Sequence, residues 1–424
     1  MAHHLEHSGY NRLTERLNRF PQGAPPSNLL AKILQMLMSD REAELVSLLP
    51  IKPFTAKQAG KAWSLSEKET KKTLDTLAGR AVLVDIIQKG ETQYVLPPPM
   101  AGFFEFSLMR VREDIDQKVL SELFYHYLNV EEDFVRELFT EGETQLGRVF
   151  VQEPAVPEEQ VVHVLDYERA TEVIESASHI GTSLCYCRHK MQHIDNACAS
   201  PLDICMTFNT SAASLIRHGH ARQIDVVEGK ELLQQAYESN LVQFGENVRQ
   251  RVNFICNCCG CCCEAMLAAK RFANLYPVHT TNFIPEILEE ECKGCGKCVN
   301  ICPVEAMSLI SANDPHKPKR RLARLSYERC LGCGLCVRAC PEKVVTLKPR
   351  EKRVITPVNN AHRTVVMAIE RGKLQHLIFD NRVLWSHRAL AAFFGVIFKL
   401  PLIKQVLANK QLQSRYLEAI MAKM

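Results

Sequence analysis

The chain has 424 residues, of which 46% are hydrophobic and 24% are charged, a balance typical of a globular protein with roughly two to four domains. Its formal net charge of +4 is too small to favour nucleic acid as a partner. The first residues, MAHHLEHSGYNRL, lack the apolar segment of a secretory signal, so we expect a cytoplasmic protein. The longest uncharged apolar run, 389–398, is about half the roughly 20 residues that a spanning helix needs, which predicts no transmembrane helix.

The N-terminal third alternates helical and strand-like patterns. Apolar spacing predicts helices at 29–38 and 42–50, and TAKQAGKAW and SEKETKKTLDTLAGRA follow them. In the last of these, Ser66 and Glu69 have the spacing of a capping box, and Leu74 and Leu77 share one face. VLVDIIQKGETQYVLPP then predicts two strands around a Lys-Gly-Glu turn.

This order of elements resembles a winged helix over residues 27–97. The resemblance suggests DNA binding, but the lysines of the candidate recognition helix are balanced by acidic residues nearby, which leaves little attraction for phosphate. We therefore expect a protein-docking or structural module. Downstream, apolar residues at helical intervals in 112–128, 131–139 and 164–181 predict a helical connector that leads into the first cysteines.

All eighteen cysteines lie between Cys185 and Cys340. Disulfides are disfavoured because the expected compartment is reducing, and because neighbours such as Cys258 and Cys259 are only about 3.8 Å apart at Cα. Metal binding is the interpretation that remains. The first group sits in LCYCRHKMQHIDNACASPLDIC and consists of Cys185, Cys187, Cys198 and Cys205.

Four thiolates suffice for one [4Fe-4S] cluster, and Arg188 between them would offset the negative charge of the cluster as a cofactor-binding residue. The second group, in FICNCCGCCCEAM, is denser and consists of Cys256, Cys258, Cys259, Cys261, Cys262 and Cys263. Six thiols exceed what one cube uses. Either two clusters draw on these ten cysteines, or a larger or non-cubane cluster uses five or more of them. The CCG at 258–260 resembles the Cys-Cys-Gly signature of heterodisulfide reductase subunits, but the other cysteines do not follow that family's spacing.

Two further runs, CKGCGKCVNICP and CLGCGLCVRACP, repeat the order C-x2-C-x2-C-x3-C-P. Two residues between cysteines let a short loop reach three corners of a small cube, and glycines such as Gly294 and Gly332 permit the tight turns. This double motif resembles the bacterial two-[4Fe-4S] ferredoxin domain over about 285–350. The resemblance implies one cluster on Cys292, Cys295, Cys298 and Cys340, and another on Cys330, Cys333, Cys336 and Cys302. It also implies a short helix and a strand after each motif.

Two basic segments remain. The connector between the motifs, 311–329, carries His316, Lys317, Lys319, Arg320, Arg321 and Arg324, and is either a solvated loop or a docking patch for an acidic redox partner. Past the motifs, 362–379 and 386–407 are helical in pattern. Arg388, Lys399 and Lys404 accompany the second of these, so 387–407 could contact a membrane surface peripherally, with packing on the core or a partner as the alternative.

Together these patterns predict an α+β, multi-domain and mainly helical fold. The expected parts are a tail at 1–26, a winged-helix-like domain at 27–100, a helical connector at 101–180, a cysteine-rich iron–sulfur domain at 181–284, a ferredoxin-like (βαβ)2 domain at 285–352 and C-terminal helices at 353–424. The order of cysteine runs is similar to that of multi-cluster iron–sulfur proteins of anaerobic bacteria.

The predicted function is electron transfer, with two ferredoxin-type [4Fe-4S] clusters and one or two further clusters relaying low-potential electrons to or from a partner oxidoreductase. One alternative is a reductase with a catalytic non-standard cluster at 256–263. Another is a winged-helix redox regulator. Because the sequence has no dinucleotide loop, P-loop or nucleophile elbow, it favours a carrier or an oxidoreductase subunit over a stand-alone enzyme.

Overall fold

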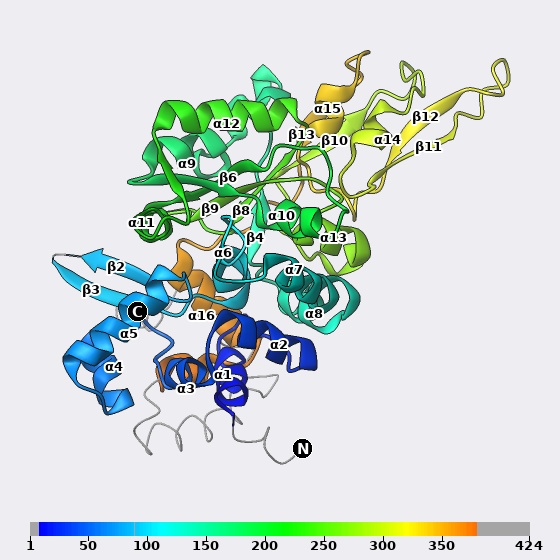
Figure 1. The fold of residues 1–424 in the computed structure, drawn as a ribbon. Helices are drawn as coiled ribbons and strands as arrows, with labels where there is room; N and C mark the ends of the chain where they lie inside the picture. The colour runs from blue at the N-terminus through cyan, green and yellow to red at the C-terminus, as the bar shows by residue number, and fades with distance from the viewer. Residues whose placement is uncertain (1–7, 89, 380–424) are drawn as a thin grey trace.

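The computed structural model describes residues 8–88 and 90–379, and combines helices with four β-sheets (Figure 1). The N-terminal region holds helices α1 to α5 and a three-stranded antiparallel sheet of order β1-β3-β2. Its elements are α1 Gly9–Leu17, α2 Asn28–Leu37, α3 Asp40–Ser47, β1 Phe54–Thr55, α4 Ala56–Trp63, α5 Glu67–Gly79, β2 Val84–Gln88 and β3 Glu91–Val95.

Helix α5 begins where the capping-box pattern places it: the Ser66 hydroxyl accepts from the Glu69 amide, and the Glu69 side chain accepts from the Ser66 amide. Leu74 and Leu77 are fully buried beneath it. The segment expected as a tail differs, because α1 forms there and buries Leu13 and Leu17. The order of helices and strands agrees with the pattern read from the sequence, while the winged-helix assignment stays a prediction.

The region expected as a helical connector contains a strand. It holds helices α6 Phe104–Phe106, α7 Gln117–Tyr125, α8 Asp133–Thr140 and α9 Ala170–Ser176, and also strand β4 Gly147–Val149. Strand β4 pairs with β8 at the edge of the largest sheet. Because β4 has only three residues and all of them are buried, neither the length of an apolar run nor an alternation of apolar and polar residues indicated a strand there.

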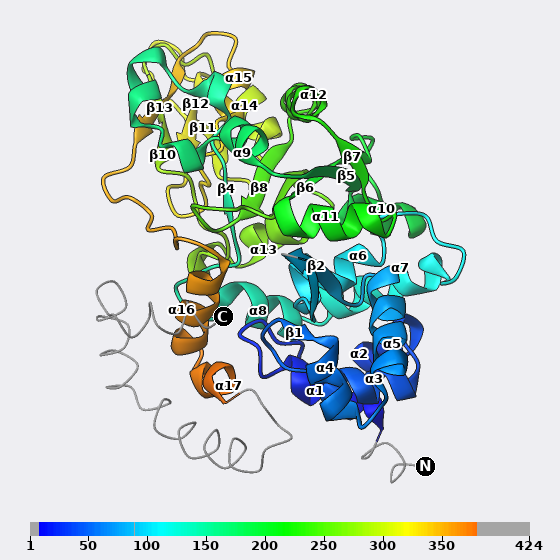
Figure 2. The ribbon, with the colours of Figure 1, turned by 90° about the vertical axis from the view of Figure 1, so that its left-hand side faces the viewer.

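The centre of the molecule is a six-stranded antiparallel sheet of order β4-β8-β9-β6-β5-β7. Helices α9 and α12 lie on one side of it, and α10, α11 and α13 lie on the other (Figures 1 and 2). The remaining elements are β5 Ile180–Leu184, α10 Tyr186–His193, β6 Asp203–Phe208, α11 Asn209–Arg217, β7 Arg222–Ile224, α12 Val226–Glu238, β8 Val242–Glu246, β9 Phe254–Cys258 and α13 Glu264–Arg271.

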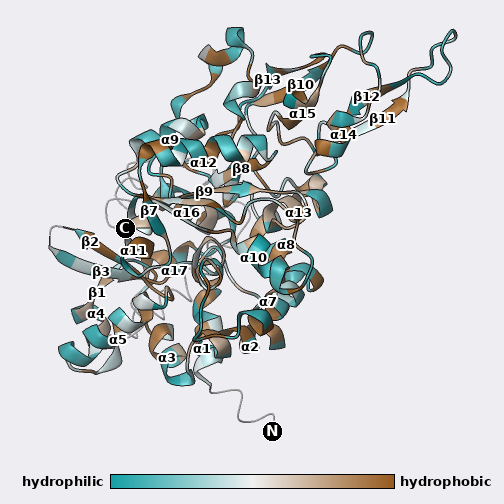
Figure 3. Ribbon diagram, turned by 45° about the horizontal axis from the view of Figure 1, so that its top comes forward, coloured by the Kyte–Doolittle hydropathy of each residue, from teal (hydrophilic) through white to brown (hydrophobic). Residues whose placement is uncertain are grey.

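The region of the two repeated motifs contains two antiparallel strand pairs, β10 with β13 and β11 with β12. Each short helix lies inside its motif, where it contains the third cysteine and ends before the fourth, and not after the motif as expected. The β11–β12 hairpin projects from the body of the molecule, and its tip is hydrophilic (Figure 3). The elements are β10 Phe283–Ile287, α14 Lys297–Ile301, β11 Met307–Ser311, β12 Arg321–Leu325, α15 Leu335–Ala339 and β13 Val345–Pro349.

The chain then returns to the N-terminal region through α16 Asn360–Glu370 and α17 Leu374–Ile378. Arg371 donates to the Pro21 carbonyl at 2.7 Å, and Lys373 contacts Glu137 at 3.1 Å. Within 8–88 and 90–379, no helix is both long and apolar enough to cross a membrane. The segment 387–407, predicted to contact a membrane surface, lies outside the described residues.

Asp85 joins the N-terminal region to the central domain and gives a pH-dependent prediction. It accepts from Ser214 and from Arg217 of α11, both at 2.6 Å. Burial raises the pKa of Asp85, but the hydrogen bond from Ser214 and the adjacent basic side chains outweigh burial and leave it below its ordinary value.

A depressed pKa means that this carboxylate stabilises the fold above the pKa of the unfolded chain, about 4, and that the stabilisation is lost as pH falls through the lower folded value. We expect Asp85→Asn to lower the urea midpoint above about pH 4, and the difference from wild type to narrow as pH falls below that value. If the difference in urea midpoint between wild type and Asp85→Asn does not change with pH, the ionised Asp85 carboxylate does not have this stabilising role.

Candidate metal centre

Strand register brings the upstream cysteines together. Cys256 and Cys258 alternate on β9, so their side chains share one face of the sheet. The neighbouring strand β6 carries Cys205, and the pairing of Met206 with Ile255 sets Cys205 beside Cys256. Cys185 follows the end of β5 and is the N-cap of α10, while Cys263 is the N-cap of α13. Two helix N-termini therefore face the same group of thiols, which favours negative charge there.

Six of the ten upstream cysteines form one continuous group, which we call the six-thiol set. Thiol contacts link Cys256 to Cys205, Cys205 to Cys185, Cys185 to Cys187, Cys187 to Cys263, and Cys263 to Cys258. The Cys263 and Cys258 sulfurs are 3.2 Å apart. Hydrogen bonds from Cys187 and Cys205, together with the Arg188 charge, lower the pKa of Cys185 well below its ordinary value. The arrangement stabilises the thiolate, the form that binds metal, at Cys185, whereas donating to Cys185 raises the pKa of Cys187 and Cys205 well above the ordinary value.

The other four cysteines form a separate four-thiol set. The sulfur atoms of Cys198, Cys259, Cys261 and Cys262 all lie within 4.8 Å of one another. A hydrogen bond from Cys262 lowers the pKa of Cys259 to about 4, although burial opposes that shift. Cys262 is fully buried and Cys261 is exposed, so this set reaches from the core to the surface. The two sets do not correspond to the two cysteine groups seen in the sequence, because each set contains cysteines from both groups.

Arg188, predicted to offset the charge of a cluster, lies beside Cys185 and Cys205 of the six-thiol set. Its side chain is 1% exposed, and Nη2 donates to the Asn257 carbonyl at 2.9 Å. Nε and Nη1 are buried without a hydrogen-bond partner among the described residues. Burial would lower the pKa of Arg188, but the Cys185 and Cys205 charges outweigh it and raise the pKa. Two unsatisfied donors beside a group of thiolates fit an anionic iron–sulfur cluster with its sulfides.

A buried ion pair holds the two cysteine runs together. Lys190 of α10 pairs with Glu264, the first residue of α13, and the two side chains are 0% and 2% exposed. Asn129 accepts from Lys190 and donates to Glu264 at 2.7 Å.

The two histidines of α10 are not part of the thiol sets. The Nε2 atoms of His189 and His193 are 3.1 Å apart, and His189 Nδ1 contacts the Leu108 carbonyl at 2.7 Å. These bonds occupy His189, so the structure gives it a structural role.

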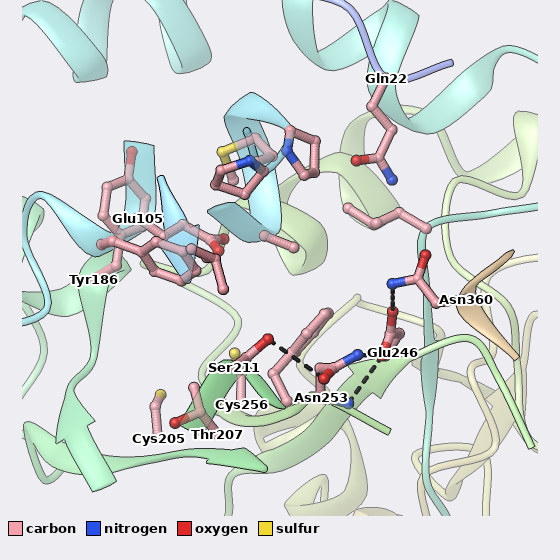
Figure 4. Close-up of a pocket in the computed structure, with 18 of the residues that line it drawn as sticks. Gln22, Glu105, Tyr186, Cys205, Thr207, Ser211, Glu246, Asn253, Cys256 and Asn360 are labelled. Carbon is pink, nitrogen blue, oxygen red and sulfur yellow. Dashed lines mark hydrogen bonds between the residues drawn. The ribbon is translucent and has the colours of Figure 1, made fainter. Parts of the chain in front are cut away.

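A cavity of about 760 Å³ borders the six-thiol set. It lies between the N-terminal region, the central sheet and α16, and the six thiols form part of its wall. Figure 4 shows Glu105 and Tyr186 close together on one side, Cys205 and Cys256 below them, and Glu246 and Asn360 across the cavity. Ser211, Asn253, Glu246 and Asn360 form a hydrogen-bonded row along that wall.

Two side chains that stay protonated at neutral pH line the cavity beside the thiols. Burial, reinforced by the Cys185 charge, raises the pKa of Glu105 to about 8. Burial also raises the pKa of Tyr186, whose hydroxyl has no hydrogen-bond partner among the described residues. The sequence offered one signal for this site, since Tyr186 stands between Cys185 and Cys187. Nothing in the sequence singled out Glu105, which comes from a segment about 80 residues upstream of the first cysteine.

The repeated motifs form two further sets that cross between the motifs. One small cavity is lined by Cys292, Cys295, Cys298 and Cys340, and another by Cys302, Cys330, Cys333 and Cys336. Backbone amides donate to several of these sulfurs, for example Ala306 to Cys302 at 3.2 Å and Gly332 to Cys330 at 3.4 Å. Gly294 and Gly332 both have positive φ, and a Cβ there would lie within 2.3 Å of a backbone oxygen. The glycines are therefore required by the turns.

The loop of the four-thiol set touches the repeated-motif region. A Cβ at Gly260 would lie 2.4 Å from the Pro303 carbonyl oxygen and 2.8 Å from its Cα. Pro303 directly follows Cys302, and Cys258, Cys263, Cys330 and Cys333 belong to one continuous buried core. The loop of the four-thiol set therefore contacts the segment that follows Cys302, and the six-thiol set and the nearer of the two repeated-motif sets border the same buried core.

Comparison with known families identifies the repeated-motif region. Residues 291–344 match the model of the 4Fe-4S dicluster domain. The chain therefore carries a ferredoxin-like iron–sulfur domain, as the sequence predicted, and the match supports an iron–sulfur electron-transfer protein. No curated protein and no solved structure matches the chain.

Proposed function

We propose that this protein is an oxidoreductase in which electrons enter at the ferredoxin-like domain and are delivered to a small molecule in the 760 Å³ cavity. The single observation that carries this proposal is that the six-thiol set forms part of the wall of a large, partly open cavity, instead of being enclosed by protein on all sides. A cluster would fill only the space against the thiols, whereas the cavity extends from them to Glu246 and Asn360. A carrier that only passes electrons between proteins has no need for that further space. The reductase alternative drawn from the sequence is thus favoured over a simple carrier.

Three of the four thiol sets have a proposed role in this function. Cys292, Cys295, Cys298 and Cys340 would hold one [4Fe-4S] cluster, and Cys302, Cys330, Cys333 and Cys336 a second. The six-thiol set would hold a further iron–sulfur cluster, with Arg188 as its charge partner. When bound, such clusters supply one electron at a time.

The entry point is supported by exposure and charge. Cys295 is exposed, and its set lies against β12, where the Ala323 amide donates to Cys292 at 3.4 Å. The hairpin that includes β12 exposes Lys317, Lys319, Arg321 and Arg324. An acidic one-electron donor protein would be attracted to this edge.

The cavity end is supported by its polar groups. Glu105 and Tyr186 lie beside the thiols and carry the protons that a reduced substrate takes up. The row that ends at Glu246 and Asn360 offers donors and acceptors to the far end of a substrate. A partly apolar small molecule with a polar end fits these walls.

The proposal is tested by iron content and EPR on the anaerobically purified full chain. We expect more than the eight irons of two cubes, and a signal beyond those of the ferredoxin-type pair. In Cys256→Ser that additional signal should be lost while the pair is unchanged. Cys261→Ser is the matched control and should keep the additional signal, because Cys261 is not in the six-thiol set. About eight irons in the wild type would overturn the proposal.

A further inference from the structure

We propose that the four-thiol set of Cys198, Cys259, Cys261 and Cys262 binds a single zinc ion, separate from every iron–sulfur cluster. The sulfur geometry carries the inference. The Cys262 sulfur lies 3.7 Å from the Cys261 sulfur and 3.9 Å from the Cys198 sulfur, and all four sulfurs lie within 4.8 Å of one another. Four thiolates around one tetrahedral ion at about 2.3 Å have sulfurs about 3.8 Å apart.

A [4Fe-4S] cube requires a wider set. Each thiolate then binds its own iron at a separate corner, which places the outer sulfurs about 6 Å apart. The four-thiol set is too compact for that arrangement, and the ligand chemistry of four thiolates suits zinc. The other cysteines do not compete for this site, because the six-thiol set and the two repeated-motif sets account for all the rest.

The position of the set indicates a structural ion. Cys259, Cys261 and Cys262 lie in the loop between β9 and α13, and Cys198 lies in the loop between α10 and β6. Four protein ligands leave no open coordination position, as in structural zinc sites. The ion would tie these two loops together and so hold Gly260 against Pro303. It would also keep four surplus thiols out of the six-thiol set.

The test is metal analysis of the full chain, purified anaerobically from a medium that contains both iron and zinc. We expect about one zinc per chain, with a zinc-edge absorption spectrum that shows four sulfurs at about 2.3 Å. In Cys261→Ser the zinc content should fall at least severalfold, with iron content and cluster EPR unchanged. Cys261 is exposed, so this variant is expected to fold. Cys256→Ser should show the reverse, with iron lost and zinc kept.

Two results would overturn the inference. A wild-type chain without zinc, whose Cys261→Ser variant loses about four irons, would place a cube at this set. A wild-type chain with one iron in place of zinc, bound by four sulfurs, would show a mononuclear site of a different metal. Neither result bears on the six-thiol set, so the proposed function and this inference fail independently.

Discussion

Lys190→Met is expected to lower the free energy of unfolding by about 3–5 kcal/mol. Lys190 and Glu264 are almost fully buried, and the lysine is the charge partner of the carboxylate. Removing the lysine leaves Glu264 with Asn129 as its hydrogen-bond donor at 2.7 Å, which does not replace a charge. Because α10 and α13 begin at cysteines of the six-thiol set, we also expect a lower iron content. Urea unfolding under anaerobic conditions and iron analysis measure the two effects.

Two matched variants separate the buried pair from general effects of substitution. The double variant Lys190→Met/Glu264→Leu removes both charges, so it should recover much of the lost stability. Lys270 lies on α13, the helix that begins with Glu264, and pairs with Glu305 at 3.2 Å, but Glu305 is 66% exposed. Lys270→Met should therefore cost less than about 1 kcal/mol. If Lys190→Met and Lys270→Met lower the free energy of unfolding by equal amounts, burial of the Lys190–Glu264 pair is energetically unimportant.

The repeated motifs were the most predictable part of the molecule, since their geometry is local. Within each run, three cysteines and two glycines lie within seven residues, and the positive φ of Gly294 and Gly296 follows from the turns that this spacing demands. The fourth cysteine of each small cavity comes from the other motif. The ligand sets that the ferredoxin resemblance implies stay a prediction.

The central sheet was not predicted, and its polarity explains why. Strands β6, β8 and β9 lie in the middle of the sheet but carry buried polar residues, among them Gln243 and Asn257, which bond to each other at 3.1 Å. Strands of this kind show neither a continuous apolar run nor a regular alternation. Without the sheet, the division of the ten upstream cysteines could not be predicted either. The division depends on the register that places Cys205 beside Cys256 and on the loop after β9, which places Cys259 beside Cys262.

The cavity could not be predicted because its wall combines segments far apart in the chain. Glu105, Ser211 and Asn360 come from different parts of the sequence, and the residues next to each of them in the chain form no recognisable motif. A spacing argument works when ligands lie in one run, as in the ferredoxin-like domain. It does not work where tertiary packing brings single residues together.

The contact between Gly260 and Pro303 gives the prediction that bears most directly on electron transfer. A side chain at position 260 must overlap the Pro303 backbone, because a Cβ would lie 2.4 Å from its carbonyl oxygen. Gly260→Val should therefore force the loop away from the ferredoxin-like domain. We expect a loss of about 1–3 kcal/mol in the free energy of unfolding, as for other overpacked sites.

The same displacement should slow electron transfer between the nearer ferredoxin-type cluster and the six-thiol set at least severalfold, while both keep their iron. Freeze-quench EPR after mixing with a reduced donor measures this step, because the two signals then appear separately. Gly79→Ala is the control: the nearest atom to a Cβ there is 4.0 Å away, so this variant should be neutral or slightly stabilising. If Gly260→Val transfers electrons as fast as the wild type, the route does not cross the Gly260–Pro303 contact, and the six-thiol set must be reduced by another path.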